Sequence, residues 1–226
     1  MSGERSNLGL TAPQEDYLKQ IFLLGERGDS VGTQSLAVRL GVRPASVTGM
    51  VQRLAELGLV HHRRYRGVTL TESGRQVALE MLRHHRLLET YLSATLGYGW
   101  AEIHDEAERL EHVISERFEE RIAEALGHPT RDPHGDPIPD AQLQLPEDDG
   151  GCRLAEGSAA GAVIVLRVGP QDPDSLAVLE RLGLVPGARL EVLEHSPAGV
   201  RIESGGARFL VPSELAAQVW LVGGDQ

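Results

Sequence analysis

The hydrophobic pattern of the chain changes near residue 159, and this change limits the possible folds more than any other feature. Before it, apolar residues recur at helical spacing, with one basic, β-prone interruption. After it, short apolar runs alternate with turn residues. Helical spacing predicts amphipathic helices, and short runs bounded by turns predict strands. The sequence therefore predicts a mainly α-helical protein with a small β domain.

The first seventy residues are typical of a winged helix-turn-helix. Helices are expected over about 13–24, 34–40 and 44–57, the second capped by Thr33. A three-residue turn that starts with glycine joins the last two, which is the helix-turn-helix signature. Residues 59–70 then form two β-prone runs around a basic centre, which predicts a hairpin wing.

Two longer amphipathic helices are expected next, over about 71–96 and 100–126, joined by the sequence G-Y-G. They are too long to belong to the winged helix alone, so they predict a second helical domain. The proline-rich segment 127–140 predicts irregular structure. The acidic, glycine-rich segment 145–158 predicts a flexible linker.

The last seventy residues predict a small β-barrel with one helical insert between its first two strands. The expected strands cover about 162–168, 188–194, 200–204 and 207–212. Aromatic residues make up only 4% of the chain, so the cores are expected to consist of aliphatic side chains. Neither a membrane-length apolar run nor a signal peptide is seen, which predicts a cytoplasmic protein with no membrane partner. The single Cys152 is expected to be a linker residue without a role.

The net charge of −11 argues against a simple nucleic-acid binder, but the charge is unevenly spread. Residues 33–75 hold 7 Lys or Arg against 2 Asp or Glu, whereas residues 99–226 hold 10 against 24. The local basic stretch is the electrostatic footprint expected of a DNA-binding surface, although a solvated basic face has the same composition.

Small polar residues open the third expected helix, where a recognition helix contacts base edges, and arginines in the wing suit backbone phosphates. The alternative is that Ser46 only caps the helix and the arginines are ordinary surface residues. The candidate DNA contacts are Thr33, Arg43, Pro44, Ala45, Ser46, Thr48, Gly49, Gln52, Arg53, Arg63, Arg64 and Arg66.

The run I-H-D-E-A-E-R-L-E-H from Ile103 carries two imidazoles and two carboxylates at helical spacing. Glu108 lies four residues after His104 and four before His112, with Glu111 between. Residues three or four apart share one face of a helix, and imidazole with carboxylate suits a divalent transition metal.

The preceding helix carries a second pair, His85 and Glu89, four residues apart. A lone pair of this kind is usually a surface interaction, but the short G-Y-G connection brings this pair towards the start of the next helix. Two sites are therefore expected, one of His85, Glu89 and His104 and one of Glu108, Glu111 and His112. The second needs a further ligand, for which Asp16 is a candidate.

These motifs, R-H-H-R-L-L-E, H-D-E-A-E-R-L-E-H and P-H-G-D-P-I-P, resemble those of the diphtheria toxin repressor family of metal-dependent transcriptional repressors. The resemblance runs from about Pro13 to Pro139 and more loosely to the end. It implies four segments: a winged helix-turn-helix over 1–73, a helical metal-binding and dimerisation domain over 74–144, a linker over 145–158 and an SH3-like domain over 159–226. It also implies a primary site of Asp16, Glu108, Glu111 and His112 and an ancillary site of His85, Glu89, His104 and Asp172.

Departures from the family pattern carry information about the metal. Iron-responsive members have Met and Cys where this chain has Asp16 and Glu108, and oxygen donors suit Mn²⁺ better than sulfur donors do. Lys19 replaces a glutamate that some manganese-responsive members use for a paired-metal cluster. Asp132 stands where a cysteine often precedes the P-H-G motif, and Gly49 replaces a longer base-reading side chain.

The resulting hypothesis is a homodimeric repressor that binds palindromic double-stranded DNA with Mn²⁺, alternatively Fe²⁺, as corepressor. Two other classes stay open on the residues alone. One is a metal-dependent hydrolytic enzyme, although the chain has no H-E-x-x-H motif or nucleophile motif. The other is a winged-helix sensor of an organic ligand, with the His and Glu residues at the surface.

Overall fold

The computed structural model describes residues 9–25, 30–63, 66–146, 150–156, 161–169 and 172–223. Arg64, one of the expected DNA contacts, lies outside this range. The chain forms two compact units. The first comprises residues up to His84 with two short later segments, 111–113 and 141–143, and the second comprises the rest.

The first unit contains a three-helix head with a hairpin. Its elements are α1 (Ala12–Leu24), α2 (Thr33–Arg39), α3 (Pro44–Glu56), β1 (Val60–Arg63) and β2 (Gly67–Leu70). The side-chain oxygen of Gln14 accepts a hydrogen bond from the Thr11 N–H at 2.9 Å, which fixes the start of α1. Each of the three helices contributes a fully buried leucine: Leu18, Leu36 and Leu54. The head has the expected order of elements, except that Gly32 and not Thr33 caps α2.

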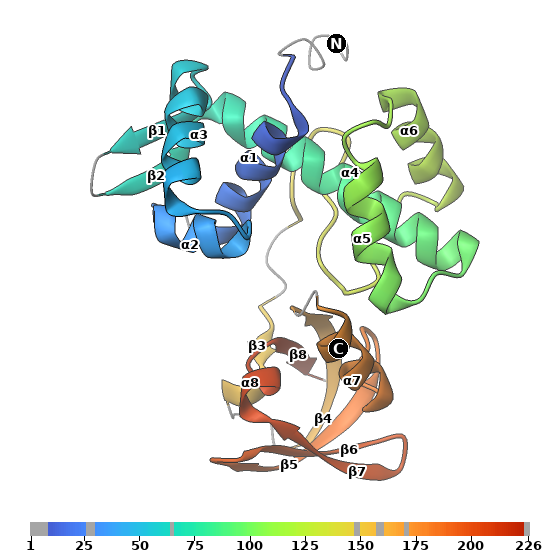
Figure 1. The fold of residues 1–226 in the computed structure, drawn as a ribbon. Coiled ribbons are helices and arrows are strands. Elements are labelled where there is room, and N and C mark those ends of the chain that lie inside the picture. Colours follow the sequence, from blue (N-terminus) through green and yellow to red (C-terminus); the bar gives the residue numbers. More distant parts are fainter. Residues whose placement is uncertain are drawn as a thin grey trace. The chain divides into compact units, whose positions relative to one another are not determined.

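Helix α4 (Glu72–Leu96) follows the hairpin as one continuous helix of 25 residues (Figure 1). Its first turn lies very close to the backbone just before β1, because a Cβ at Gly74 would be 1.9 Å from the Leu59 carbonyl oxygen. The first half of α4 belongs to the first unit, and the half from His85 onward belongs to the second.

The helix expected over 100–126 is two helices, which corrects the sequence prediction. Helix α5 (Trp100–Leu110) ends before a turn at 111–113, and α6 (Glu116–Ala125) begins after it. The cause is Ser115, whose hydroxyl accepts from the Phe118 N–H at 3.3 Å and caps α6. Glu111 and His112 therefore lie in a turn, where helical spacing no longer relates them to Glu108.

The helical core of the second unit is aliphatic, as expected. It consists of Leu87, Leu88, Leu92, Ile103, Ala107, Ile122, Ala123 and Ile138. The segment after α6 is irregular. Its turn at 132–136 is held by one Asp132 carboxylate oxygen, which accepts from the N–H groups of His134 and Asp136 at 2.9 Å each.

The C-terminal part of the second unit is a six-stranded antiparallel sheet in the order β3-β8-β4-β5-β6-β7. Its elements are β3 (Cys152–Arg153), a 3₁₀ helix η2 (Leu154–Glu156), β4 (Gly161–Val168), α7 (Pro173–Arg181), β5 (Arg189–Ser196), β6 (Gly199–Ser204), β7 (Ala207–Pro212), α8 (Ser213–Ala216) and β8 (Val219–Gly223). Helix α8 lies against β6 and β7 (Figure 1).

Four strands and the inserted helix α7 match the expectation, and four elements, β3, η2, α8 and β8, do not. Strand β8 and helix α8 were not expected. Part of the expected linker belongs to the sheet, because Cys152 pairs with Leu221 and the Leu154 side chain is buried in the core. Cys152 is therefore an exposed residue of an edge strand rather than a linker residue. Helical N-terminal domains with a C-terminal β-sheet domain confirm the predicted fold class.

Candidate metal centres and DNA-binding surface

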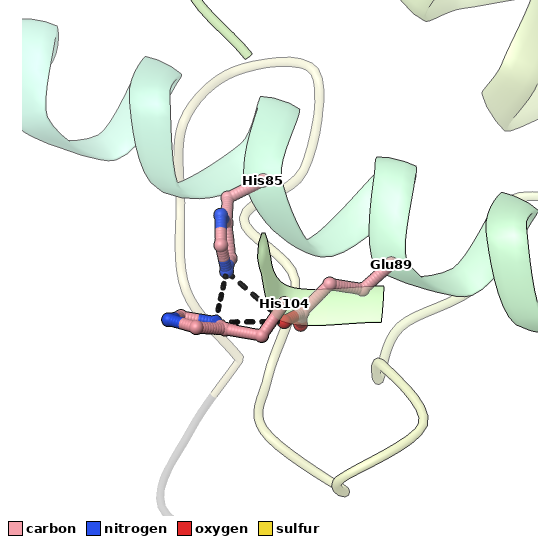
Figure 2. Close-up of side chains that lie close together, drawn as sticks. All are labelled: His85, Glu89 and His104. Atoms are coloured by element: carbon pink, nitrogen blue, oxygen red, sulfur yellow. Dashed lines mark hydrogen bonds and ion pairs between the residues drawn. The ribbon is translucent and has the colours of Figure 1, made fainter. Parts of the chain in front are cut away.

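Three side chains of the second unit form what we call the ancillary cluster: His85, Glu89 and His104. His85 and Glu89 project from α4 towards His104 of α5 (Figure 2). One oxygen of Glu89 lies 3.0 Å from His85 Nε2 and 3.2 Å from His104 Nδ1, and these two nitrogens are 3.2 Å apart. Three donor atoms thus converge on one point, as the sequence predicted.

Glu89 is ionised in this cluster although its side chain is only 3% exposed. Burial alone would raise its pKa. The neighbouring His85 and hydrogen bonds from His104, His134 and His85 instead hold the pKa of Glu89 well below its usual range. A buried carboxylate surrounded by imidazoles is the arrangement that a divalent ion would join.

The turn at 132–136 adds two groups to Glu89 that the sequence reasoning did not assign. His134 Nδ1 lies 3.6 Å from the second Glu89 oxygen, and Asp132 also contributes a donor atom to this neighbourhood. Burial, with the charges of Asp136 and Glu89, raises the pKa of Asp132 to about 7. Among the described residues, the buried His134 Nε2 has no hydrogen-bond partner. The motif P-H-G-D contains His134, but its spacing does not relate His134 to Glu89.

The first unit contains what we call the primary cluster: Asp16, Glu111 and His112. His112 Nε2 lies 3.0 Å from an Asp16 oxygen and 3.5 Å from a Glu111 oxygen. Its other nitrogen, Nδ1, lies 2.7 Å from Glu15. Hydrogen bonds to Asp16 and Glu15 raise the pKa of His112 to about 10, so the imidazole is a cation between two carboxylates.

Two further contacts hold the turn that carries Glu111. The Lys19 ammonium lies 2.5 Å from Glu111 Oε1, and both side chains are buried. His84 Nδ1 of α4 lies 3.1 Å from the Glu111 carbonyl oxygen. Neither Glu15 nor Lys19 was assigned a role in the primary cluster from the sequence, because their contacts join residues more than ninety positions apart.

The structure places two expected ligands away from the clusters to which they were assigned. Glu108 lies on α5, where its half-exposed carboxylate is 3.7 Å from His104 Nε2. Asp172 caps α7, and its carboxylate accepts from the Ser175 N–H at 2.8 Å, which lowers the pKa of Asp172. Within the described residues, neither belongs to a group with metal-binding geometry.

The expected DNA contacts on α3 lie on its solvent-exposed side. Ser46, Thr48, Gly49, Gln52 and Arg53 are all exposed, while the opposite side buries Val47, Val51 and Leu54. Arg43, Pro44 and Ala45 at the start of the helix are exposed as well, as are Arg63 and Arg66 of the hairpin, and Thr33 is half-buried at the start of α2. A polar, exposed face of a helix beside a basic hairpin is typical of the recognition helix and wing of a DNA-binding winged-helix domain.

Three family models match the chain in succession. They describe the N-terminal DNA-binding domain of iron-dependent repressors (residues 9–68), the metal-binding and dimerisation domain of the same repressors (71–140) and the FeoA domain (152–222). Fold and matches together define a metal-dependent transcriptional repressor that binds DNA and carries a dimerisation domain. The chain belongs to the family of iron-dependent repressors that includes the diphtheria toxin repressor and IdeR, in the form with a C-terminal FeoA domain.

Individual relatives agree with this assignment. The iron-dependent repressor IdeR of Mycobacterium tuberculosis is 35% identical over 91% of this chain and 94% of its own length. The diphtheria toxin repressor of Corynebacterium efficiens is 32% identical over 84% of this chain and 87% of its own. A solved manganese-dependent transcriptional repressor in complex with manganese is 43% identical, with a TM-score of 0.85 over 93% of this chain and 99% of that chain. The manganese regulator SloR is 33% identical, with a TM-score of 0.78 over 95% of this chain and 100% of that chain.

The family assignment confirms the resemblance, the repressor function and the DNA and dimer partners. As a member of a family of transcriptional repressors, the protein is not an enzyme and works in the cytoplasm. No helix that the structure describes is long and apolar enough to cross a membrane. The exact domain boundaries and the individual ligands stay predictions.

Proposed function

We propose that this repressor uses Mn²⁺ as its corepressor. The proposal rests on the donor set of the primary cluster, which combines two carboxylates and one imidazole and includes no sulfur atom of a described residue. Hard oxygen donors with imidazole suit Mn²⁺, whereas sulfur donors favour softer ions. Fe²⁺ accepts the same donors and is the alternative.

The donor set fits a metal by its chemistry and spacing. One ligand atom each from Asp16, Glu111 and His112 lies within 4.8 Å of the other two. We assign the primary site to these residues together with Glu108, and the ancillary site to His85, Glu89 and His104 with Asp172. In the metal-free protein the protonated His112 supplies positive charge to these carboxylates, and a bound divalent ion would supply that charge instead.

The chain's own residues link this site to DNA binding. Asp16 lies in the DNA-binding domain and Glu111 and His112 in the metal-binding and dimerisation domain. Joint ligation by these residues holds α1 to the turn at 111–113, so one conformation of the head is favoured over others. In a homodimer, two α3 helices held in this way match successive half-sites of a palindrome.

A manganese titration of DNA binding tests the proposal. A duplex is first selected from a random pool with manganese-loaded protein. It is then shifted in gels at increasing MnCl₂ by the wild type, Asp16→Ala, Glu108→Ala and the surface control Glu120→Ala. We expect the wild type and the control to bind only with Mn²⁺, and both ligand variants to need at least about tenfold more.

The outcomes separate the parts of the proposal. Metal-independent binding by the wild type, or an unchanged response of Asp16→Ala, refutes metal regulation through the primary cluster. An unchanged response of Glu108→Ala removes only Glu108 from the ligand set. If DNA binding under anaerobic conditions needs a lower concentration of Fe²⁺ than of Mn²⁺, iron takes the place of manganese in the proposal.

A further inference from the structure

A buried lysine lies directly beside the primary cluster. The side chain of Lys19 is 3% exposed and that of its partner Glu111 is 0% exposed. Removing two charges from water costs several kcal/mol for each ion, and their attraction offsets this only when the geometry is good. At 2.5 Å between Nζ and Oε1, the ammonium and the carboxylate are in direct contact.

The ammonium binds an atom that belongs to the metal cluster. Glu111 Oε1, which contacts Lys19, is also the oxygen that faces His112 Nε2 at 3.5 Å. Lys19 follows Asp16 by three residues on α1, so both side chains lie on the same side of that helix. Helix α1 therefore supplies one carboxylate of the cluster, that of Asp16, and also the ammonium of Lys19, which binds a second carboxylate of the cluster, that of Glu111.

We propose that Lys19 is a tethered cation that competes with the metal for Glu111 and so sets the metal concentration at which the primary cluster fills. Without metal, its charge compensates that of Glu111. A divalent ion at the cluster meets that positive charge at close range, where the low-dielectric interior screens it little. The inference rests on the proposed primary site.

A purely structural lysine predicts the opposite effect of substitution. If Lys19 only positioned Glu111, removing its charge would loosen the turn and weaken metal binding. If Lys19 competes, the removal strengthens binding, because the ion no longer faces the repulsion of the ammonium and Glu111 Oε1 is no longer bound to it. The direction of the change therefore decides between the two roles.

The experiment is an electron paramagnetic resonance titration of free Mn²⁺ with the full chain. The variants are Lys19→Gln, which removes the charge but keeps a hydrogen-bond donor, Lys19→Met, which removes both, and Lys19→Arg, which keeps both. Asp16→Ala identifies the primary-cluster part of the isotherm as the part that it removes. Circular dichroism and the urea midpoint show which variants are folded.

We expect Lys19→Gln to bind Mn²⁺ at the primary cluster at least about fivefold more tightly than the wild type, Lys19→Met to change in the same direction, and Lys19→Arg to match the wild type within about twofold. Binding by folded Lys19→Gln that is equal to or weaker than wild type overturns the inference. If Asp16→Ala removes no part of the isotherm, the primary site itself is wrong and the proposed function fails with it.

Discussion

The primary and ancillary clusters use the same two donor types but are assembled in different ways. The ancillary cluster joins side chains of α4 and α5, two helices that follow each other, and its central carboxylate is ionised because imidazoles surround it. The primary cluster joins α1 to a turn almost a hundred residues later, and its imidazole is charged because carboxylates surround it. One is a carboxylate held by histidines, and the other is a histidine held by carboxylates.

The difference suggests a division of roles. Glu89 is nearly inaccessible, so the ancillary cluster is part of the core of its unit. Asp16 has a side chain 37% exposed and can change partners at little cost. The cluster that links the DNA-binding head to the later turn thus has one accessible ligand, Asp16, whereas the central carboxylate of the ancillary cluster is buried. We expect metal to act on stability mainly at the ancillary cluster and on DNA binding mainly at the primary cluster.

The largest expected effect is that of Glu89→Ala on folding. Removing this carboxylate leaves the buried His85 and His134 and the partly exposed His104 without their shared partner, and breaking a buried charge pair costs about 3–5 kcal/mol. Urea denaturation of metal-free protein measures the change in the free energy of unfolding. The matched control Glu120→Ala, an exposed position of α6, should stay within about 0.5 kcal/mol. A loss below about 1 kcal/mol for Glu89→Ala would mean that the ancillary cluster is not part of the core.

A smaller effect is expected from Glu15→Gln at the primary cluster. Glu15 contacts His112 Nδ1, while Nε2 faces Asp16 and Glu111, so Glu15 orients the imidazole without belonging to the cluster. Loss of such a supporting carboxylate lowers metal affinity by about tenfold or more. Isothermal titration with MnCl₂ measures this, with Glu120→Gln as the control. An affinity equal to that of the wild type would show that His112 needs no such support.

The last expected effect is a pH dependence of metal-free stability that comes from the primary cluster. The pKa of His112 is raised from 6.5 to about 10, so between these values the folded state binds more protons than the unfolded state. Stability from His112 is therefore complete below about pH 6.5 and is lost as the pH rises towards 10. We expect the melting temperature to fall between pH 7 and 9.5 in the wild type and to fall less in His112→Gln. Equal slopes in the two proteins would contradict the assigned charge of His112.

Much of the fold was predictable because the signals are local. Helical spacing, glycine stops and turn residues predicted the head, the hairpin, α4 and four strands of the sheet. The break at 111–115 was missed because a capping serine inside an amphipathic pattern competes with helix continuation, and the cap decided the outcome. Strand β3 was missed because two residues after a glycine-rich segment carry no periodicity.

For the candidate sites, too, local relations were predictable and relations between distant segments were not. His85, Glu89 and His104 were grouped correctly because i,i+4 spacing and a short connection relate them. Glu108 was grouped with His112 by a helical relation that ends at Leu110, and in this structure its carboxylate lies beside His104 instead.

The sequence by itself determined the order of helical and β parts, the donor types available for metal and the family to which the chain belongs. Each of these depends on residue identity or on spacing within one element. Only the tertiary structure decided which donors meet, that Lys19 pairs with Glu111 and that His134 lies beside Glu89. Side-chain periodicity relates residues along one helix or strand, whereas contacts between distant segments depend on how buried surfaces pack.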